Sequence, residues 1–389
     1  MQSTSPSVNL VFDRFKPDGG TERLALNTVE ALSGHSIRIA VCAREWRGPM
    51  RDNIEFIRCR PLPFGRAWRL RRFVADALPQ LRARGGLVQA HIMFPGADIY
   101  RADGGAHAQW LTQRRRIQSA ARQAYDIATP YHRTKLAMEA EMLSHPDLRY
   151  VICNSEMVRA DIRRHYPGCQ AELVLVEPGI DLDHFRVVDA DARRHAARKA
   201  LDLEADATVL LFIGTGFERK GLVTAIAALA EWGEHRAQLV IIGRDRDRWR
   251  YSKLARQMGV HGQLRFVGPV DDVRPWLHAG DALIHPALYE PFGLVVVEAM
   301  AAGLPVLSSP TTGAARAMVR EQQTGWLIDA LDVHGYAKAL RGLTSRSSQQ
   351  IASQRMACEK AATPYGLQRM SIDLMQIYRQ CLLPTPKAP

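Results

Sequence analysis

The sequence predicts an α/β protein built from two doubly wound, Rossmann-like domains that face each other. The chain has 389 residues, more than one hydrophobic core ordinarily supports. A strand, a glycine-containing loop, a helix and a second strand are predicted over 8–42, and the same order recurs over 208–243. Strand-like and helix-like segments then keep alternating, as in parallel sheets covered by helices.

The first βαβ unit begins with the apolar run VNLVFD (8–13) and ends with the strand IRIAVC (37–42). Between them, the turn-rich KPDGG precedes a helical pattern over 21–32. Gly19 and Gly20 stand directly before this helix. Glycine there permits tight turning, and it also permits close approach of the backbone to a ligand, so both interpretations stay open.

The second βαβ unit consists of a strand over 208–214, the loop TGFERKG, a helix over 222–232 and a strand over 237–243. The later elements continue the alternation. Helices are predicted over 248–260, 273–280 and 293–303, and strands over 264–268, 281–286 and 305–309.

The change of domain is predicted within or just after residues 166–185. We therefore expect an N-terminal domain over 1–185, a C-terminal domain over 186–365, and a helix with a loose tail over 366–389. Apolar residues recur at helical spacing in this last segment, which gives the helix a face that can pack back on the N-terminal domain. They are Leu367, Met370, Leu374, Ile377 and Cys381.

Composition predicts a cytoplasmic protein. The start MQSTSPSVNLVF lacks the basic region and cleavage site of a signal peptide. No uncharged apolar run approaches the ~20 residues that span a bilayer. The six cysteines are scattered without a Cys-x-x-Cys pair, which is typical of reduced thiols and not of disulfides or zinc ligands.

A net charge of +12 predicts an anionic partner: nucleic acid, a membrane surface or a phosphorylated substrate. Arginines crowd residues 60–84 and 114–135. In 109–135 they alternate with Trp110, Tyr125 and other apolar residues, as in a segment at a membrane interface. An ordinary domain helix is the alternative. No nucleic-acid-binding motif is recognisable.

The loop TGFERKG places Arg219 and Lys220 just before or within the first turn of a helix. Helix starts attract anions through free N–H groups and the helix dipole. Arginine can fork onto phosphate oxygens, and lysine adds a point charge. Two cations match the dipole of an unliganded helix start poorly, so a diphosphate site is favoured over a surface pair.

The segment YEPFGLVVVEAM (289–300) carries Glu290 and Glu298. Glu290 follows a predicted strand at its carboxyl end, where ligands bind in open α/β sheets. Phe292, Gly293 and Leu294 lead into a helix whose first amides are free to bind a ligand. Glu298 lies further in among apolar residues, where a carboxylate needs partners. A ribose would offer two hydroxyl groups; an internal arginine or a backbone donor is the alternative.

The block EPFGLVVVEA (290–299) resembles the two-glutamate signature of the family 4 glycosyltransferases, retaining enzymes of the GT-B fold. The blocks RKG (219–221), PGID (178–181) and GLPV (303–306) are also similar to family blocks, in the expected order. The resemblance covers nearly the whole chain and is stronger in its second half. It implies a GT-B protein with a cleft between two domains.

This resemblance implies a role for each candidate residue at a nucleotide-sugar donor. Glu298 would hold the ribose, and Arg219 and Lys220 the diphosphate. Glu290 would hold the donor sugar together with the amides near Phe292, Gly293 and Leu294. Gly19 and Gly20 would approach the diphosphate from the N-terminal domain, which is the acceptor side. Whether Glu290 only positions the sugar stays open.

Within the family, FPGAD (94–98), Asp103 and the stretch 109–135 are similar to the lipopolysaccharide core glucosyltransferases that act on the first heptose. This similarity implies transfer of a hexose, glucose from a UDP-linked donor, to a lipopolysaccharide core or other membrane-linked glycan. It also implies a peripheral position on the cytoplasmic face of the inner membrane. We place the first-domain catalytic group at Asp103, with His91 and His107 as alternatives.

No metal and no cofactor are expected, because the nucleotide-sugar is a co-substrate. Asp245 and Asp247 form an Asp-x-Asp pattern after a strand, which binds metal in the other glycosyltransferase fold, but the arginines between and beside them compete for both carboxylates. Two other functions stay open: an epimerase-like enzyme that uses nucleotide-sugars on the same fold, and a basic nucleic-acid-binding protein.

Overall fold

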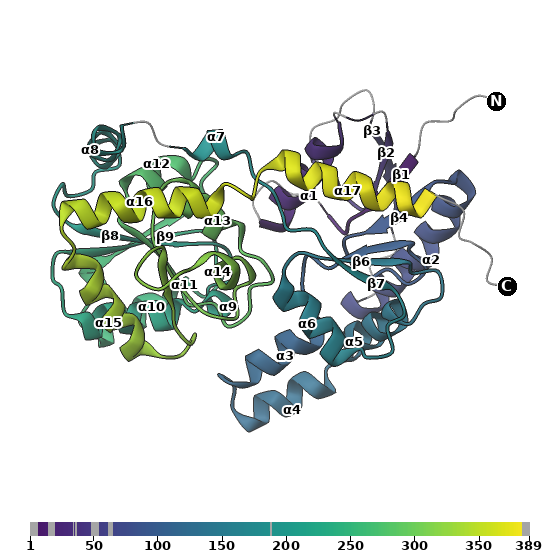
Figure 1. Cartoon of the computed structure of the whole chain (residues 1–389). Helices are drawn as coiled ribbons and strands as arrows, with labels where there is room; N and C mark the ends of the chain where they lie inside the picture. The colour runs from purple at the N-terminus through teal and green to yellow at the C-terminus, as the bar shows by residue number, and fades with distance from the viewer. Residues whose placement is uncertain are drawn as a thin grey trace. The chain divides into compact units, whose positions relative to one another are not determined.

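The computed structural model describes residues 7–14, 20–33, 35, 37–47, 54–60, 65–186 and 189–382 (Figure 1). The chain divides into two compact units. Unit 1 comprises Met1–Gly179 with Leu367–Pro389, and unit 2 comprises Ile180–Gly366. The chain passes from unit 1 to unit 2 between Gly179 and Ile180, ahead of the boundary expected between residues 185 and 186, and it returns to unit 1 at Leu367. The tail predicted to be loose lies, from residue 383 on, outside the described residues.

Unit 1 contains a seven-stranded sheet in the order β3-β2-β1-β4-β5-β6-β7, with every neighbouring pair parallel. The chain runs outward from β1 to β3 and then returns to place β4 on the other side of β1. The carboxyl ends of β1 and β4 therefore form the switch point at which doubly wound sheets bind ligands. The strands are β1 (Ser7–Val11), β2 (Arg38–Ala43), β3 (Ile54–Arg58), β4 (Leu87–Ala90), β5 (Ile99–Arg101), β6 (Tyr150–Cys153) and β7 (Glu172–Leu175).

The helices of unit 1 include one that the chain supplies from its far end. α17 packs against α1 and contacts β4, so the C-terminal helix belongs to the N-terminal unit (Figure 1). Its buried residues Met370, Leu374 and Tyr378 join the core that α1, β1 and β2 build. The helices are α1 (Gly20–Ser33), α2 (Arg66–Arg84), α3 (His107–Arg115), α4 (Ala120–Ala128), α5 (Pro130–Leu143), α6 (Glu156–His165) and α17 (Leu367–Leu382).

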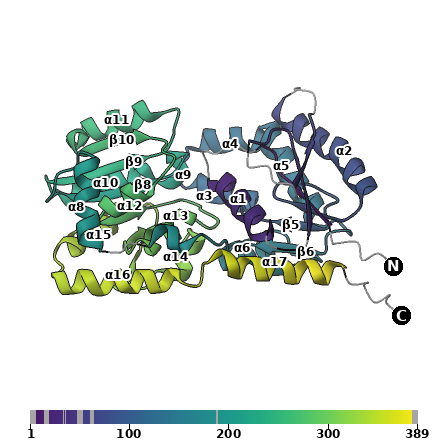
Figure 2. The ribbon, with the colours of Figure 1, turned by 90° about the horizontal axis from the view of Figure 1, so that it is seen from above.

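Unit 2 repeats the plan with a six-stranded parallel sheet in the order β10-β9-β8-β11-β12-β13. Figure 2 shows β8, β9 and β10 side by side in this order. The switch point lies between β8 and β11, because the chain leaves β8 towards β9 and returns on its other side. The strands are β8 (Thr208–Ile213), β9 (Ala237–Ile242), β10 (Leu264–Gly268), β11 (Ala282–His285), β12 (Val306–Ser308) and β13 (Gly325–Leu327).

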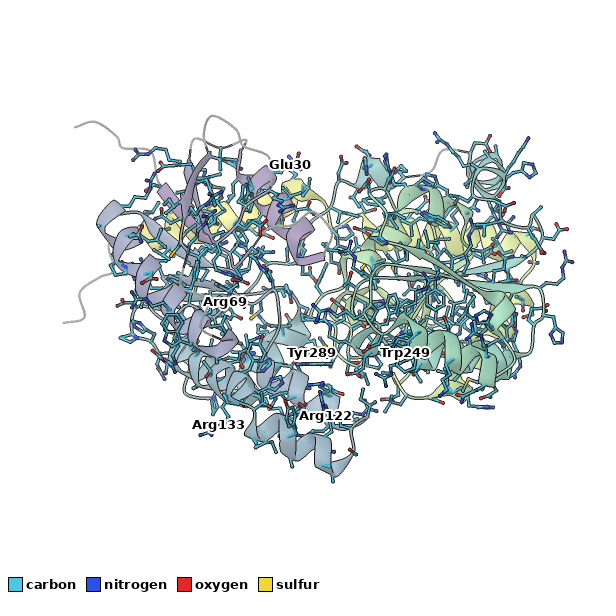
Figure 3. All side chains as sticks on the ribbon, turned by 180° about the vertical axis from the view of Figure 1, so that it is seen from behind. Glu30, Arg69, Arg122, Arg133, Trp249 and Tyr289 are labelled. Atoms are coloured by element: carbon cyan, nitrogen blue, oxygen red, sulfur yellow. The ribbon has the colours of Figure 1, made fainter. Side chains whose placement is uncertain are left out.

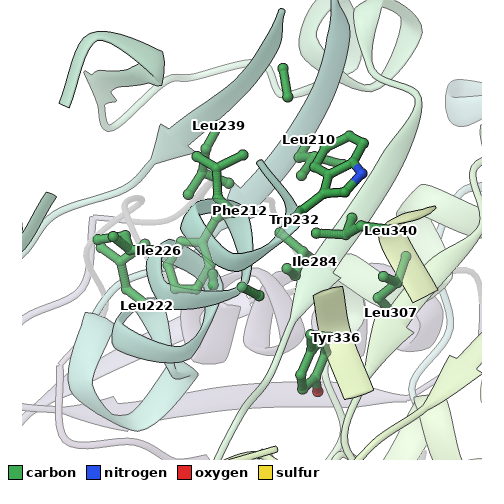
Figure 4. Close-up of a cluster of buried hydrophobic side chains, with 14 of the residues drawn as sticks. Leu210, Phe212, Leu222, Ile226, Trp232, Leu239, Ile284, Leu307, Tyr336 and Leu340 are labelled. Carbon is green, nitrogen blue, oxygen red and sulfur yellow. The ribbon is translucent and has the colours of Figure 1, made fainter. Parts of the chain in front are cut away.

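The core of unit 2 forms where α10 and α15 pack together over this sheet (Figure 4). Phe212 of β8, Ile226 of α10 and Leu340 of α15 are fully buried there. The helices of unit 2 are α7 (Leu182–Phe185), α8 (Ala190–Ala200), α9 (Phe217–Lys220), α10 (Leu222–Trp232), α11 (Arg248–Gln257), a 3-10 turn (His261–Gln263), α12 (Arg274–Ala279), α13 (Leu294–Ala301), α14 (Gly313–Met318), α15 (Val333–Thr344) and α16 (Ser348–Ala362).

Candidate functional site

The switch point of unit 2 brings together the two cations and the first glutamate that the sequence singled out. Arg219 and Lys220 end α9, which follows β8, and Glu290 follows β11. Lys220 Nζ lies 2.6 Å and Arg219 Nη2 lies 3.3 Å from Oε2 of Glu290. The Lys220 side chain is 11% exposed and that of Glu290 13%, whereas Arg219 keeps 37%. The carboxylate thus faces both cations from one side.

The charges of this cluster are mutually dependent. Burial alone would raise the pKa of Glu290, but Lys220 and Arg219 overcome it and lower the pKa to about 2. Burial lowers the pKa of Lys220, and Glu290 and Glu298 partly offset that loss. An anion that approached Lys220 and Arg219 would replace Glu290 as the negatively charged partner of these two cations.

Two glycines let the loop after β8 close over the sheet. A Cβ on Gly214 would lie 2.4 Å from Cε of Lys220, so the lysine stem runs across the space of the missing side chain. Gly221 has φ +77°, and a Cβ there would lie 1.9 Å from the carbonyl oxygen of Pro286. The positive φ favours glycine at both positions, and at Gly221 the backbone oxygen also leaves no room for a Cβ.

The loop after β11 is held by backbone hydrogen bonds to the start of α14. Glu290 donates its N–H to the Thr311 carbonyl at 2.9 Å, and its own carbonyl accepts from Gly313 at 3.0 Å. The Phe292 carbonyl accepts from Ala314 at 2.8 Å. Gly293, at φ 92°, caps α13, which Leu294 begins. This loop therefore fixes Glu290 and directs the first amides of α13.

The side chains around these amides are interior. Phe292 is 4% exposed and Leu294 9%, so each would offer a ligand its backbone. Tyr289, which precedes the loop and is labelled in Figure 3, is 1% exposed. Glu298 is 2% exposed within α13, all of whose residues are buried. Its carboxylate is one of the charges that raise the pKa of Lys220.

His285 joins the cluster although the sequence did not single it out. It ends β11 and is fully buried, and within the described structure both ring nitrogens have no hydrogen-bond partner. Burial, with a smaller effect of Lys220, lowers its pKa to about 3, so the ring is neutral at pH 7. A histidine inside the apolar run ALIH was the available signal.

Asp103 and His91 meet at the switch point of unit 1. His91 follows β4, and its Nδ1 lies 2.7 Å from Oδ2 of Asp103. Arg101, the last residue of β5, donates from Nε to Oδ1 at 3.0 Å. The Phe12 ring, just beyond β1, stacks on His91 with centroids 4.3 Å apart. Burial alone would raise the pKa of Asp103, but Arg101 and His91 have the larger combined effect and lower it. The Asp103 carboxylate is therefore ionised.

The third candidate, His107, belongs to a different cluster. It begins α3, and its Nε2 lies 3.1 Å from Nδ1 of His132 on α5. Glu139 accepts its backbone N–H. Burial, with Lys135, lowers the pKa of His107 to about 3. The structure therefore groups Asp103 with His91 and not with His107.

The remaining predicted positions divide between described and undescribed parts of the chain. Gly19 lies outside the described residues, and Gly20 is the first residue of α1. Asp245 accepts backbone N–H bonds from Phe217 at 2.7 Å and from Asp247 at 2.8 Å. Its carboxylate thus supports the start of α9. Among the described residues, no group of three acidic, histidine or cysteine side chains is arranged to hold a metal ion.

Two family models match successive parts of the chain. The model described as Glycosyltransferase Family 4 matches residues 18–184, and that described as Glycosyl transferases group 1 matches 193–363. A D-inositol 3-phosphate glycosyltransferase of Catenulispora acidiphila is 33% identical over 225 residues, or 54% of this chain. The alignment spans about half of that relative's length, 52%.

A second relative aligns over almost its whole length. The lipopolysaccharide glucosyltransferase WaaG of Escherichia coli is 26% identical over 93% of this chain and 96% of its own. The crystal structure of WaaG superposes with a TM-score of 0.81 at 24% identity, covering 95% of this chain and 99% of WaaG. Anabaena Alr3699/HepE in complex with UDP-glucose superposes at 0.72 and 17% identity, covering 96% and 99%.

These matches confirm the fold and the family that the motifs predicted. Among the described residues, none of the helices combines the length and apolar content that a membrane crossing requires. The chain has two parallel-sheet Rossmann-like units in succession, and the two family models together cover most of its length. The chain belongs to the family 4 glycosyltransferases and has the GT-B fold.

Proposed function

We propose that this glycosyltransferase moves a hexose, glucose, from a UDP-linked donor to a lipopolysaccharide core or another membrane-linked glycan, with retention of configuration. The observation that carries the proposal is the cluster of Lys220, Arg219 and Glu290 at the switch point of unit 2. The glucosyltransferase WaaG among the relatives and HepE, solved with UDP-glucose, support the choice of donor and acceptor class.

The diphosphate of the donor binds Arg219 and Lys220. Lys220 is buried and desolvated, and its Nζ donates to the Glu290 carboxylate, so a diphosphate oxygen can replace that partner at little reorganisation cost. Bond cleavage builds negative charge on the diphosphate, and fixed cations stabilise charge that develops in the transition state. Glu298 takes the ribose hydroxyls.

The displaced Glu290 carboxylate and the first amides of α13 hold the donor sugar. Before the donor binds, Lys220 and Arg219 lower the pKa of Glu290 to about 2, so an ionised carboxylate meets a sugar that becomes oxocarbenium-like. The acceptor hydroxyl attacks from the face of the leaving group, and the departing phosphate takes its proton. Retaining hydrolases place a nucleophilic carboxylate ~5 Å from a second carboxyl group. We assign Glu290 a positioning and electrostatic role. No metal or cofactor takes part.

Asp103 serves the acceptor side, where its ionised carboxylate orients the groups around the incoming hydroxyl. The pairing with His91 and Arg101 supports this choice over His107. That Gly19 and Gly20 contact the diphosphate stays a prediction from the sequence.

The acceptor is membrane-linked, and the segment from the end of α3 through α4 and α5, which includes the exposed Arg115 and Arg116, supplies a surface for anionic headgroups. Tyr125 and Ile127 of α4 are 61% and 60% exposed. Arg122 of α4 and Arg133 of α5 are also exposed (Figure 3), and Arg122 lies over the Tyr125 ring. Leu111, by contrast, is buried in the unit. The enzyme acts on the cytoplasmic face of the inner membrane.

Mass spectrometry of the core oligosaccharide tests this function. Cells that lack the protein should produce a core shorter by one hexose, and the wild-type gene, but not a Lys220→Ala gene, should restore it. An unchanged core would refute the proposed acceptor.

Incubation of UDP-glucose with purified protein and no acceptor tests the epimerase-like alternative, which predicts an isomerised sugar. Salt-sensitive RNA or DNA binding without UDP-glucose binding would favour the nucleic-acid alternative.

A further inference from the structure

A chain of hydrogen bonds runs from the C-terminal helix to Asp103. Tyr378 of α17 donates from its hydroxyl to Oε1 of Gln89 at 2.8 Å. Nε2 of Gln89 lies 2.9 Å from Nε2 of His91, and Nδ1 of His91 lies 2.7 Å from Oδ2 of Asp103. Gln89 lies on β4 and His91 just beyond its end. The chain therefore connects residues 289 positions apart in the sequence.

The chemistry of the groups fixes the direction of every bond. The Asp103 carboxylate is ionised and can only accept, so Nδ1 of His91 carries a proton. Burial lowers the pKa of His91, so the ring is neutral and its Nε2 accepts. The Gln89 atom that faces Nε2 is then the NH2 group, which leaves Oε1 to accept from Tyr378. Each donor meets an acceptor, and one tautomer of His91 satisfies the whole chain.

Water does not compete for these groups. Gln89 and Tyr378 are fully buried, and the side chains of His91 and Asp103 are 1% and 2% exposed. Arg101, also fully buried, donates to the other carboxylate oxygen. In such surroundings each bond polarises the next, and a group that loses its partner finds no replacement.

The helix that carries Tyr378 is itself held at several points. His35 Nε2 lies 2.6 Å from the hydroxyl of Ser371, near the start of α17. Arg149 donates to the carbonyls of Gln380 and Cys381 at its end. Nη2 of Arg101 lies 3.8 Å from the sulfur of Met370. These contacts fix the position of Tyr378, and its hydroxyl in turn fixes the orientation of the Gln89 amide.

We propose that Tyr378 and Gln89 are positioning residues, which hold His91 in its Nδ1–H tautomer and thereby orient the Asp103 carboxylate for the transfer reaction. The effect on turnover rests on the proposed function of Asp103, whereas the tautomer does not. The C-terminal helix accordingly completes the acceptor-side chemistry of unit 1 as well as its core.

The substitution Tyr378→Phe tests this proposal, because it removes one hydroxyl and keeps the ring. The protein is labelled with 15N-histidine, and the His91 signal is recognised among 13 histidines as the one lost in His91→Gln. In the wild type we expect the Nδ1–H tautomer. In Tyr378→Phe the amide of Gln89 is free to turn, and we expect Nε2 to become protonated in part of the molecules. Turnover should fall about tenfold while the KM for UDP-glucose is unchanged.

Tyr336→Phe is the matched control. Tyr336 is fully buried as well, and its hydroxyl donates to the Ile328 carbonyl in unit 2. This variant should lose similar thermal stability yet keep the His91 spectrum and the turnover of the wild type. Gln89→Glu is a second test: it places acceptor oxygens against Nε2 and should protonate that nitrogen.

Three outcomes would overturn the proposal. A wild-type His91 in the Nε2–H tautomer would overturn it, as would a Tyr378→Phe variant with unchanged spectrum and turnover. An equal loss of turnover in Tyr336→Phe would reduce Tyr378 to a general stabilising role and also overturn it. Absence of transfer by a wild-type protein that shows the expected tautomer changes would refute the proposed function and support the positioning of His91.

Discussion

Nζ of Lys220 lies 2.6 Å from Oε2 of Glu290, and both side chains are nearly enclosed at the carboxyl ends of β8 and β11. The motifs assign Lys220 to the diphosphate of a donor and Glu290 to its sugar. In the structure these two side chains form an ion pair with each other. The ion pair stabilises two buried charges that would otherwise be costly. It also makes the site dependent on an exchange of partners when a diphosphate arrives.

Glu290→Gln should separate donor binding from turnover. Removal of the carboxylate frees Lys220 and Arg219 and removes a negative charge that opposes the diphosphate. Calorimetry should show UDP binding tightened about tenfold, while turnover falls at least tenfold because the sugar loses its charged partner. Glu218→Gln removes the same charge from an exposed position on α9 and should change both quantities much less. Weaker UDP binding by Glu290→Gln would contradict the exchange of partners.

Gly221→Ala should lower the stability of unit 2 by more than the positive φ of Gly221 alone would explain. Gly221 and Gly233 have nearly equal φ, +77° and +75°, but only a Cβ at Gly221 would strike a backbone oxygen, whereas at Gly233 nothing lies within 4 Å. Gly233→Ala should lower stability by ~1 kcal/mol, and Gly221→Ala by at least ~2 kcal/mol more. Urea unfolding measures both, and equal losses would show that the loop can relax away from Pro286.

His285→Gln should reduce the sensitivity of the protein to acid. The folded protein keeps His285 neutral down to a pKa of about 3, whereas the unfolded chain protonates it near 6.5. The unfolded state therefore binds the extra proton as pH falls from 6.5 to 3, and stability is lost across that window, by up to ~1.4 kcal/mol per pH unit.

The comparison is the melting temperature at pH 7, 6, 5 and 4. In His285→Gln it should fall less steeply than in the wild type. His334→Gln removes a histidine whose side chain is 75% exposed, and its curve should follow that of the wild type. Parallel curves for all three proteins would show that His285 titrates normally.

The arginines of α3 and α4 should govern binding to anionic membranes. Exposed Arg115, Arg116 and Arg122 are changed together to Ser, and sedimentation is measured with vesicles of neutral and of anionic lipid. Each lost cation removes ~1 kcal/mol of attraction to the anionic surface. The same change at the exposed Arg246, Arg250 and Arg256 of unit 2 lowers net charge equally. Similar effects of both sets would indicate attraction by net charge alone and no local membrane surface.

The residues that form the cluster of unit 2 could be named from the sequence because local patterns identify them. The run TVLLFIG ending in a glycine loop and the apolar helix around Glu298 each identify an element and its end. The ion pair between Lys220 and Glu290 was not predicted. It joins side chains 70 residues apart, and their facing depends on the order β8-β11 in the sheet, which no local pattern encodes.

The group around Asp103 was harder to predict for the same reason. Asp103 and His91 were named as alternatives, and only the structure shows that they are partners. β4 and β5 have four and three residues, and the buried Gln89 and Arg101 interrupt their apolar pattern, so no strand was assigned there. Tyr378 was not singled out within the predicted C-terminal helix, because its partner Gln89 lies 289 residues away.

Transfer of glucose by Lys220→Ala and Glu298→Ala tests the central claim most directly. Purified wild-type and variant proteins are incubated with UDP-glucose and truncated core lipopolysaccharide, after their folding has been verified by thermal unfolding. Because the claim assigns the diphosphate to Lys220 and the ribose to Glu298, kcat/KM should fall at least 100-fold in each variant. Wild-type rates in both folded variants would contradict the assignment of the donor site to this cluster.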